Sequence, residues 1–142
     1  MKFLIIFMSF LFIEHGCAQE KINQDALSLE YSAHSRGTFK HILINKKSIS
    51  VVNERSGTPI VKSFTETDWE TILKALKHVD IENIPNLKAP SENRFFDGAA
   101  IASLKIIYDG KTYESQSFDH GNPPKEIVQL VKEILSISEN IE

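Results

Sequence analysis

The chain has 142 residues, of which 42% are hydrophobic and 25% are charged, and its formal net charge is -3. These values are ordinary for a globular protein, and the length fits one domain that can bury a core without disulfides. The chain has no basic stretch, which argues against a nucleic-acid partner. The single cysteine, Cys17, leaves the rest of the chain without a disulfide or a catalytic thiol.

The first 18 residues have the layout of a secretory signal peptide. Lys2 precedes an apolar run over 3–13, and small residues follow at Gly16 and Ala18. The run is shorter than the roughly 20 apolar residues that span a bilayer. We therefore expect cleavage after Ala18 and export of the mature chain, which would be periplasmic or secreted.

Cys17 offers an alternative, in which it becomes the lipid-modified N-terminus of a membrane-anchored lipoprotein. Gly16 fits the pattern that precedes such a cysteine, whereas Glu14 and His15 do not. Lipidation of Cys17 would hold the domain at a membrane through its acyl chains. The expected division of the chain is a signal peptide over 1–18, a flexible lead-in over 19–25 and a single domain over 26–142.

The domain begins with four predicted β-strands. Apolar and polar residues alternate with a period of two over the first of them, as in a half-buried strand. Turn residues separate the strands, and Pro59 before the fourth suits a sheet edge. The predicted strands cover residues 27–34, 38–45, 48–53 and 60–64.

The second and third strands predict their own register. If the two lysines at 46–47 form the turn, Ile44 faces Ile49 and Ile42 faces Val51. All four side chains then share one face, as stabilising cross-strand pairs do. The lysine pair lacks the Asn-Gly chemistry that is usual in such turns.

A helix is predicted after the fourth strand. Thr65 is its expected N-cap, and Asp68 three residues later makes a variant of the capping box. Phe64 and Trp69 are placed to form a hydrophobic staple across the cap. The helix then carries one apolar stripe, formed by Trp69, Ile72, Leu73, Leu76 and Val79.

Residues 80–99 show no regular pattern. Ile81, Ile84 and Leu87 are spaced by three, which indicates a single turn packed on the core. Pro85 breaks regular structure within this stretch. A connection of this length inside a compact domain is usually functional or disordered, or contains an element that the pattern does not reveal.

A β-hairpin follows, with the Asp-Gly pair at 109–110 as a type I′ turn. Counting back from the turn, Ile106 faces Tyr113 and Leu104 faces Ser115, so the register agrees with the apolar pattern.

The last predicted element is a helix with Asn122 as N-cap and Pro123 at its first position. Its apolar stripe consists of Ile127, Leu130, Val131, Ile134 and Leu135. The element order ββββ-α-ββ-α predicts an α+β fold, with a largely antiparallel sheet of about six strands and two helices on one face.

Two unusual segments, 94–98 and 117–122, flank the predicted hairpin. The register of the hairpin brings the end of the first segment close to the second. Residues near Ala100 then approach residues near Asp119, beside the expected N-terminus of the last helix, whose free N–H groups favour an anion. The predicted binding patch consists of Arg94, Phe95, Phe96, Asp97, Asp119 and His120.

This patch has a functional and a structural interpretation. As a recognition patch, Arg94 would pair with a carboxylate of the ligand, and Phe95 and Phe96 would supply apolar anchors. His120 would donate or accept a hydrogen bond. As a structural feature, Phe95 and Phe96 would close the core and Asp119 would pair with Arg94.

Two other functions stay open. An enzyme would use His120 with Asp119 or Asp97 as an acid–base pair, but no nucleophile is evident and we predict no catalytic residue. A protease-inhibitor-like module would present the loop 88–99. We predict neither metal nor cofactor, because no metal-ligand spacing occurs among the histidines after the signal, His34, His41, His78 and His120.

The signal, the phrase RFFDGAA at 94–100 and the phrase SFDHGNPP at 117–124 resemble small exported proteins of Bacteroidetes-type bacteria with no assigned activity. The resemblance implies a bacterial envelope address and transfers no catalytic residue. We expect a non-enzymatic domain that binds a protein or a peptide-like ligand in the envelope.

Overall fold

The computed structural model describes residues 22–141. The predicted signal peptide and Cys17 lie outside these residues. The described chain forms an antiparallel sheet in the order β4-β3-β2-β1-β5-β6, with β7 also paired to β5. The strands are β1 (Leu27–His34), β2 (Phe39–Asn45), β3 (Ser48–Val52), β4 (Ile60–Ser63), β5 (Ile101–Tyr108), β6 (Lys111–Glu114) and β7 (Phe118–Asp119).

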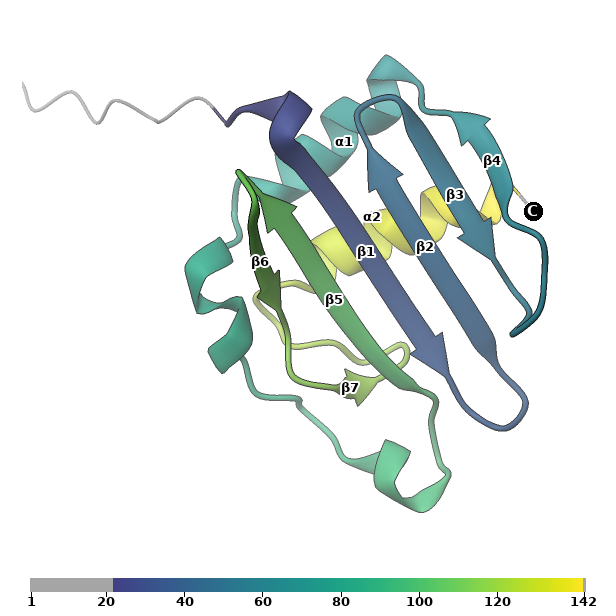
Figure 1. Ribbon diagram of the computed structural model, residues 1–142. Coiled ribbons are helices and arrows are strands. Elements are labelled where there is room, and N and C mark those ends of the chain that lie inside the picture. Colours follow the sequence, from purple (N-terminus) through teal and green to yellow (C-terminus); the bar gives the residue numbers. More distant parts are fainter. Residues whose placement is uncertain (1–21, 142) are drawn as a thin grey trace, which may run out of the picture.

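Two α-helices, α1 (Glu66–Leu76) and α2 (Val128–Glu139), contact each other and lie behind the sheet in Figure 1. Three short 3-10 helices complete the described elements: η1 (Gln24–Ala26), η2 (Ile81–Asn86) and η3 (Asn93–Phe96). The predicted α+β fold with a largely antiparallel sheet is therefore confirmed. Within residues 22–141, no helix is both long and apolar enough to span a bilayer.

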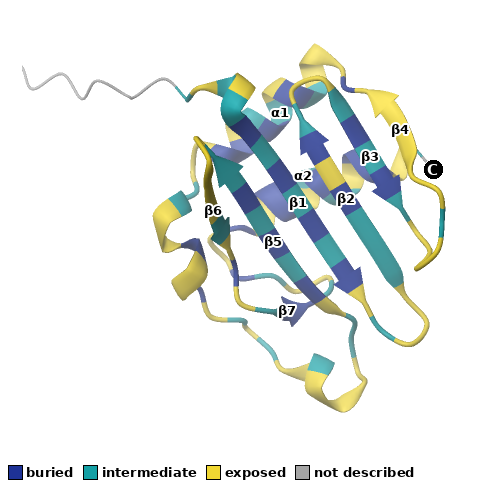
Figure 2. Cartoon of the chain, in the orientation of Figure 1, coloured by how far each residue is buried: buried dark blue, intermediate teal, exposed yellow. Residues whose placement is uncertain are grey.

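The core lies between the sheet and the two helices. Along the middle strands, buried residues alternate with partly exposed ones, which gives the banded colouring of Figure 2. The predicted register is confirmed, because Ile44 pairs with Ile49 and Ile42 pairs with Val51, and all four are fully buried. Asn45 supplies the missing turn chemistry, since its Oδ1 accepts hydrogen bonds from the N–H groups of Lys47 and Ser48.

The predicted start of α1 is also confirmed. Thr65 Oγ1 accepts a hydrogen bond from the Asp68 N–H at 3.1 Å and donates one to the Asp68 carboxylate at 2.6 Å. The rings of Phe64 and Trp69 meet edge to face, with centroids 6.1 Å apart. This staple fixes the direction in which the helix leaves β4.

The hairpin of β5 and β6 has the predicted register, with Ile106 paired to Tyr113. Asp109 and Gly110 both have positive φ, 51° and 76°, as a type I′ turn requires. Ser115 lies beyond β6 but keeps the register, because its N–H donates to the Leu104 carbonyl.

The predicted start of the last helix is wrong, because α2 begins at Val128 and Asn122 is not its N-cap. Pro123 and Pro124 follow Asn122, and a residue that precedes proline is driven toward an extended conformation. Asn122 instead forms an isolated bridge with Asp119. The expected anion site at a helix N-terminus beside Asp119 is therefore not formed.

The end of the lead-in is attached to the domain. From Ile22 onward the chain packs on the core, and η1 follows. Gln24 accepts a hydrogen bond from the Trp69 indole N–H at 3.0 Å, and the Asn23 N–H donates to the Tyr108 hydroxyl at 3.2 Å. These contacts join residues 22–24 to the domain, and the flexibility of the lead-in over 19–25 stays a prediction.

Residues 80–99 contain two elements that the pattern did not fully reveal. The apolar spacing of three corresponds to η2, where Ile84 is fully buried, and Leu87 just after it is 6% exposed. The segment then leaves the core and forms η3 below the sheet in the view of Figure 1. We call residues 88–97 the tip segment.

Candidate functional site

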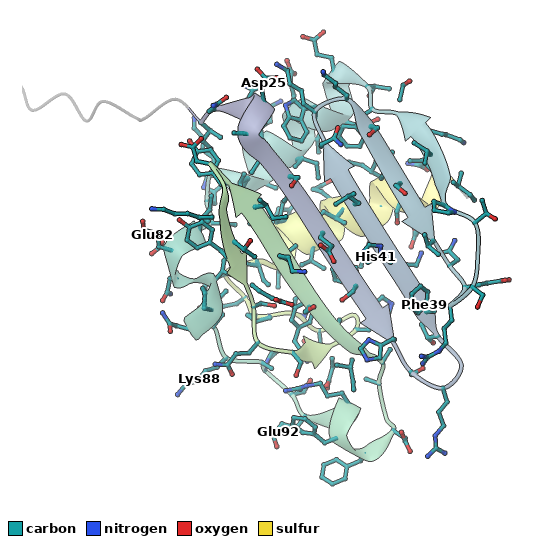
Figure 3. All side chains as sticks on the ribbon, viewed as in Figure 1. Asp25, Phe39, His41, Glu82, Lys88 and Glu92 are labelled. Atoms are coloured by element: carbon teal, nitrogen blue, oxygen red, sulfur yellow. The ribbon has the colours of Figure 1, made fainter. Side chains whose placement is uncertain are left out.

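The tip segment extends beyond the lower end of the sheet, as its labelled residues Lys88 and Glu92 show in Figure 3. It makes contact with the domain through the short strand β7, which pairs with the beginning of β5. In this pairing Asp119 lies opposite Ile101 and Phe118 opposite Ala102. The predicted approach of residues near 100 to residues near 119 is therefore confirmed.

Asp119 is the residue around which the tip segment folds. Its side chain is 2% exposed and accepts four hydrogen bonds from that segment. Oδ2 accepts from the Ser91 hydroxyl at 2.6 Å and the Asn93 N–H at 2.8 Å. Oδ1 accepts from the Arg94 N–H at 3.0 Å and from Arg94 Nη1 at 3.1 Å.

Arg94 belongs to the same buried network. Its side chain is 7% exposed; Nε donates to the Ser117 hydroxyl at 3.0 Å, and Nη1 also donates to the Ser91 carbonyl at 2.6 Å. Arg94 and Asp119 thus form a buried, multiply hydrogen-bonded ion pair, as the structural interpretation expected. The guanidinium acts within the fold and does not stand open to a ligand carboxylate.

The charge of Asp119 is stabilised by these donors. Burial acts to raise the pKa of Asp119, but the hydrogen bonds from Ser91, Arg94 and Asn93 outweigh it and lower the pKa from 3.8 to about 2. Asp119 is therefore a permanent anion at neutral pH. Its carboxylate is fully occupied by donors of the fold, which leaves it unsuited to proton transfer.

Phe95 and Phe96 do not close the core, which corrects the structural interpretation. Phe95 is 61% exposed and Phe96 is 83% exposed. Among the large apolar side chains of residues 22–141, Phe96 has the largest exposed fraction, and Phe95 is close to Val61, which is 62% exposed. The Arg94 guanidinium carbon lies 4.2 Å from the centre of the Phe95 ring. This cation–π contact holds one face of the Phe95 ring against the Arg94 guanidinium.

Asp97 ends η3 and turns the chain back toward the sheet. Its φ is 56°, in the left-handed region that aspartate adopts more readily than most residues. The next N–H, that of Gly98, donates to the Asn93 carbonyl at 2.9 Å. Asp97 thus closes the turn that presents the two phenylalanines, and its side chain stays exposed beside them.

His120 points away from this network. Successive side chains of a strand alternate between its faces, so Phe118 and His120 lie on the core side while Asp119 faces the tip segment. His120 Nδ1 shares a 2.7 Å hydrogen bond with the hydroxyl of Tyr31, which is fully buried. Burial, and then the charge of Lys40, lower the pKa of His120 below its usual range.

The six residues of the predicted patch therefore divide into two groups. Arg94, Phe95, Phe96, Asp97 and Asp119 build one unit, and His120 belongs to the core-side contact with Tyr31. Asp119 and His120 do not form the predicted acid–base pair, because Asp119 is bound by the tip segment and His120 by Tyr31. The pairing of His120 with Asp97 stays a prediction.

Sequence reasoning missed three side chains of the network, those of Ser91, Ser117 and Asn122. Ser91 donates to Asp119 and accepts from the Asn122 side chain at 2.7 Å, so it joins the tip segment to the loop after β7. Asn122, predicted as a helix N-cap, belongs to this network through its bond to Ser91. No local pattern marks Ser91, because its role depends on residues 28 and 31 positions away.

A second group of charges lies on the open face of the sheet. Glu30 accepts hydrogen bonds from His41 at 3.0 Å and from Lys105 at 3.3 Å. Burial acts to raise the pKa of Glu30, but these two partners lower it below its usual range. Among residues 22–141, no three His, Cys, Asp or Glu side chains are grouped so that they could hold a metal ion.

Comparisons of this chain with known proteins matched no family model, no curated protein and no solved structure.

Proposed function

We propose that this chain is an exported, non-enzymatic domain that binds a protein through Phe95 and Phe96. The observation that carries the proposal is the exposure of both rings, 61% and 83%, on a segment whose backbone is fixed by a buried carboxylate. Export rests on the apolar run and the small residues that precede residue 19 in the sequence.

Two adjacent exposed phenylalanines are costly in water unless something covers them. Burial of apolar surface stabilises a complex by about 25 cal/mol per Å², and aromatic side chains bury about 150–250 Å² each. Aromatic residues are accordingly enriched in the centres of protein interfaces. A segment that is already ordered loses less conformational entropy on binding, so a fixed tip favours affinity.

The charges around the rings indicate the chemistry of the partner. Glu92 precedes the two phenylalanines in the sequence, Asp97 follows them, and both acids are exposed, whereas Arg94 is neutralised by Asp119. The exposed tip is therefore apolar with an acidic border. We expect the partner to present an apolar pocket bordered by lysine or arginine, since complementary charges guide association.

The conformation of the tip favours this function over protease inhibition. Extended peptides bind by adding a strand to a sheet edge, and a protease-inhibiting loop would have to offer such an extended segment. Asn93–Phe96 instead form the 3-10 helix η3. The acid–base alternative is not favoured either, because Asp119 and His120 are engaged separately.

The test compares three tagged chains for the proteins they retain from an envelope extract. The variant that removes the anchor carries Phe95→Ser and Phe96→Ser. The matched control is Val61→Ser, because Val61 on the edge strand β4 is 62% exposed and lies outside the tip segment. Each captured protein is identified and its retention is measured at low and high salt.

We expect one protein to be retained by the wild type and by Val61→Ser, to be lost with the double variant and to weaken at high salt. Removal of a central aromatic anchor commonly costs about 2 kcal/mol or more, which corresponds to roughly thirtyfold in affinity. Equal retention by the double variant and the wild type would refute the proposal.

A further inference from the structure

We propose that a second copy of this chain is a partner of the tip, so that the domain forms a dimer by reciprocal insertion. This inference rests on the proposed function, because it uses the same two phenylalanines. It adds the receiving surface, which is a groove along α2 on the side of the loop after β7.

The groove is apolar and large enough for the tip. Pro123, Val131 and Leu135 line it together with Val128, which is 42% exposed. Its volume is about 470 Å³. A cavity of about 150 Å³ holds one benzene ring, so the groove has room for both phenyl rings.

The charges of the two surfaces are complementary. Lys132 borders the groove. Val128 lies four residues before Lys132 and therefore on the same face of α2. Glu92 and Asp97 border the tip. The only acid in the groove lining is Glu139, which lies seven residues beyond Lys132, or about 10 Å along the helix. A tip seated near Val128 would thus meet a cation.

The tip and the groove are also neighbours within one copy. Asn122 lies between two lining residues, Gly121 and Pro123, and its side chain donates to Ser91 of the tip segment at 2.7 Å. Because the two surfaces adjoin, one two-fold axis near this loop can place each tip in the other copy's groove. Such an interface is self-complementary and closes at a dimer.

Sedimentation of the mature chain over a range of concentrations tests the inference. We expect a monomer–dimer equilibrium without larger species. Phe96→Ser should raise the dimer dissociation constant by about 900-fold, because each dimer loses two anchors that are worth roughly thirtyfold each. Val61→Ser should leave the dissociation constant unchanged.

Charge exchange and mixing identify the interface. Glu92→Lys and Lys132→Glu should each weaken the dimer, and the chain that carries both should recover it. A chain with Phe96→Ser keeps its groove, and a chain with Val128→Glu keeps its tip. Their mixture therefore regains one intact tip–groove contact and should dimerise more tightly than either variant alone, but more weakly than the wild type. Circular dichroism confirms that each variant is folded.

A chain that stays monomeric at every concentration would overturn the inference, and so would a dimer that persists with Phe96→Ser. The proposed function fails separately. If the wild type is monomeric but loses a captured protein with the double phenylalanine variant, the tip binds a different protein and only the second-copy inference is wrong.

Discussion

The sheet and its two helices are held together by one kind of interaction, and the tip segment is held by another. Within residues 22–141, twenty-four buried apolar residues from the strands, the helices and their connections form one core, so no single contact decides the fold. The tip segment contributes no fully buried apolar residue and depends on four hydrogen bonds to one carboxylate. A distributed apolar core unfolds as a unit, whereas a segment held by one polar residue can be released alone.

The largest effect is expected in the core. Leu104 on β5 is fully buried and pairs with the buried Tyr31 of β1. Leu104→Ala should lower the free energy of unfolding by about 2–5 kcal/mol, since it removes buried methyl groups and leaves a cavity. Chemical denaturation measures this change. A loss below about 1 kcal/mol would mean that the sheet does not form the central core.

Asp119→Asn should act on the tip segment more than on the sheet. The amide NH₂ group is a donor and meets the donors that now bind a carboxylate. The Asn93 and Arg94 amides should then exchange with solvent at least about tenfold faster, while the amides of β1 and β5 change little. Hydrogen exchange resolved by residue measures both regions, and equal acceleration in both would contradict the separation.

Acid should weaken the two regions in different pH ranges. The pKa of Asp119 is about 2 in the folded chain and 3.8 without these contacts, so the unfolded state takes up the proton first as the pH falls. The stabilisation by Asp119 is therefore complete above pH 3.8 and is lost as the pH falls toward 2. Unfolding titrations of wild type and Asp119→Asn should converge in that range.

His120 should act at higher pH. Its pKa is lowered from 6.5 in the folded chain, so the unfolded state again binds the proton first, and stability falls as the pH drops below 6.5. His120→Gln should remove this part of the pH dependence and leave the part below pH 3.8 intact. An unchanged titration in the upper range would show that His120 is not held neutral by the core.

The smallest effect on stability is expected at the tip itself. Phe96 is 83% exposed, and surface substitutions away from special features usually change stability by no more than about 0.5 kcal/mol. Phe96→Ser should thus leave the free energy of unfolding nearly unchanged while it weakens binding. A clear loss of stability would show that the ring packs against the domain.

The sheet could be predicted from sequence because its signals are local. The alternation of apolar residues and the length of the turns fix which residues face each other, as Ile42, Ile44 and Ile106 illustrate. The N-cap Thr65 lies three residues from its partner Asp68, so it could also be predicted from the local sequence.

The site was predicted only in part because its contacts are distant in sequence. The pairing of β5 with β7 places residues near 100 beside Asp119, which the hairpin register already implied. The hydrogen bonds of Ser91 and the role of Asn122 follow from how the tip segment folds over β7, and no local pattern contains that information. The predicted start of α2 was wrong because a proline after an N-cap residue is typical of a helix start, whereas two consecutive prolines favour an extended chain before them.

The role of the fixed tip segment is tested most directly by the binding of a chain that keeps both phenylalanines but loses the hydrogen bonds of the tip segment to Asp119. Retention of the captured protein is measured for wild type, Asp119→Asn and the double phenylalanine variant under the same conditions. We expect Asp119→Asn to bind more weakly than the wild type, because a released tip must be ordered again on binding. Wild-type retention by Asp119→Asn, together with accelerated exchange at Asn93 and Arg94, would contradict this expectation.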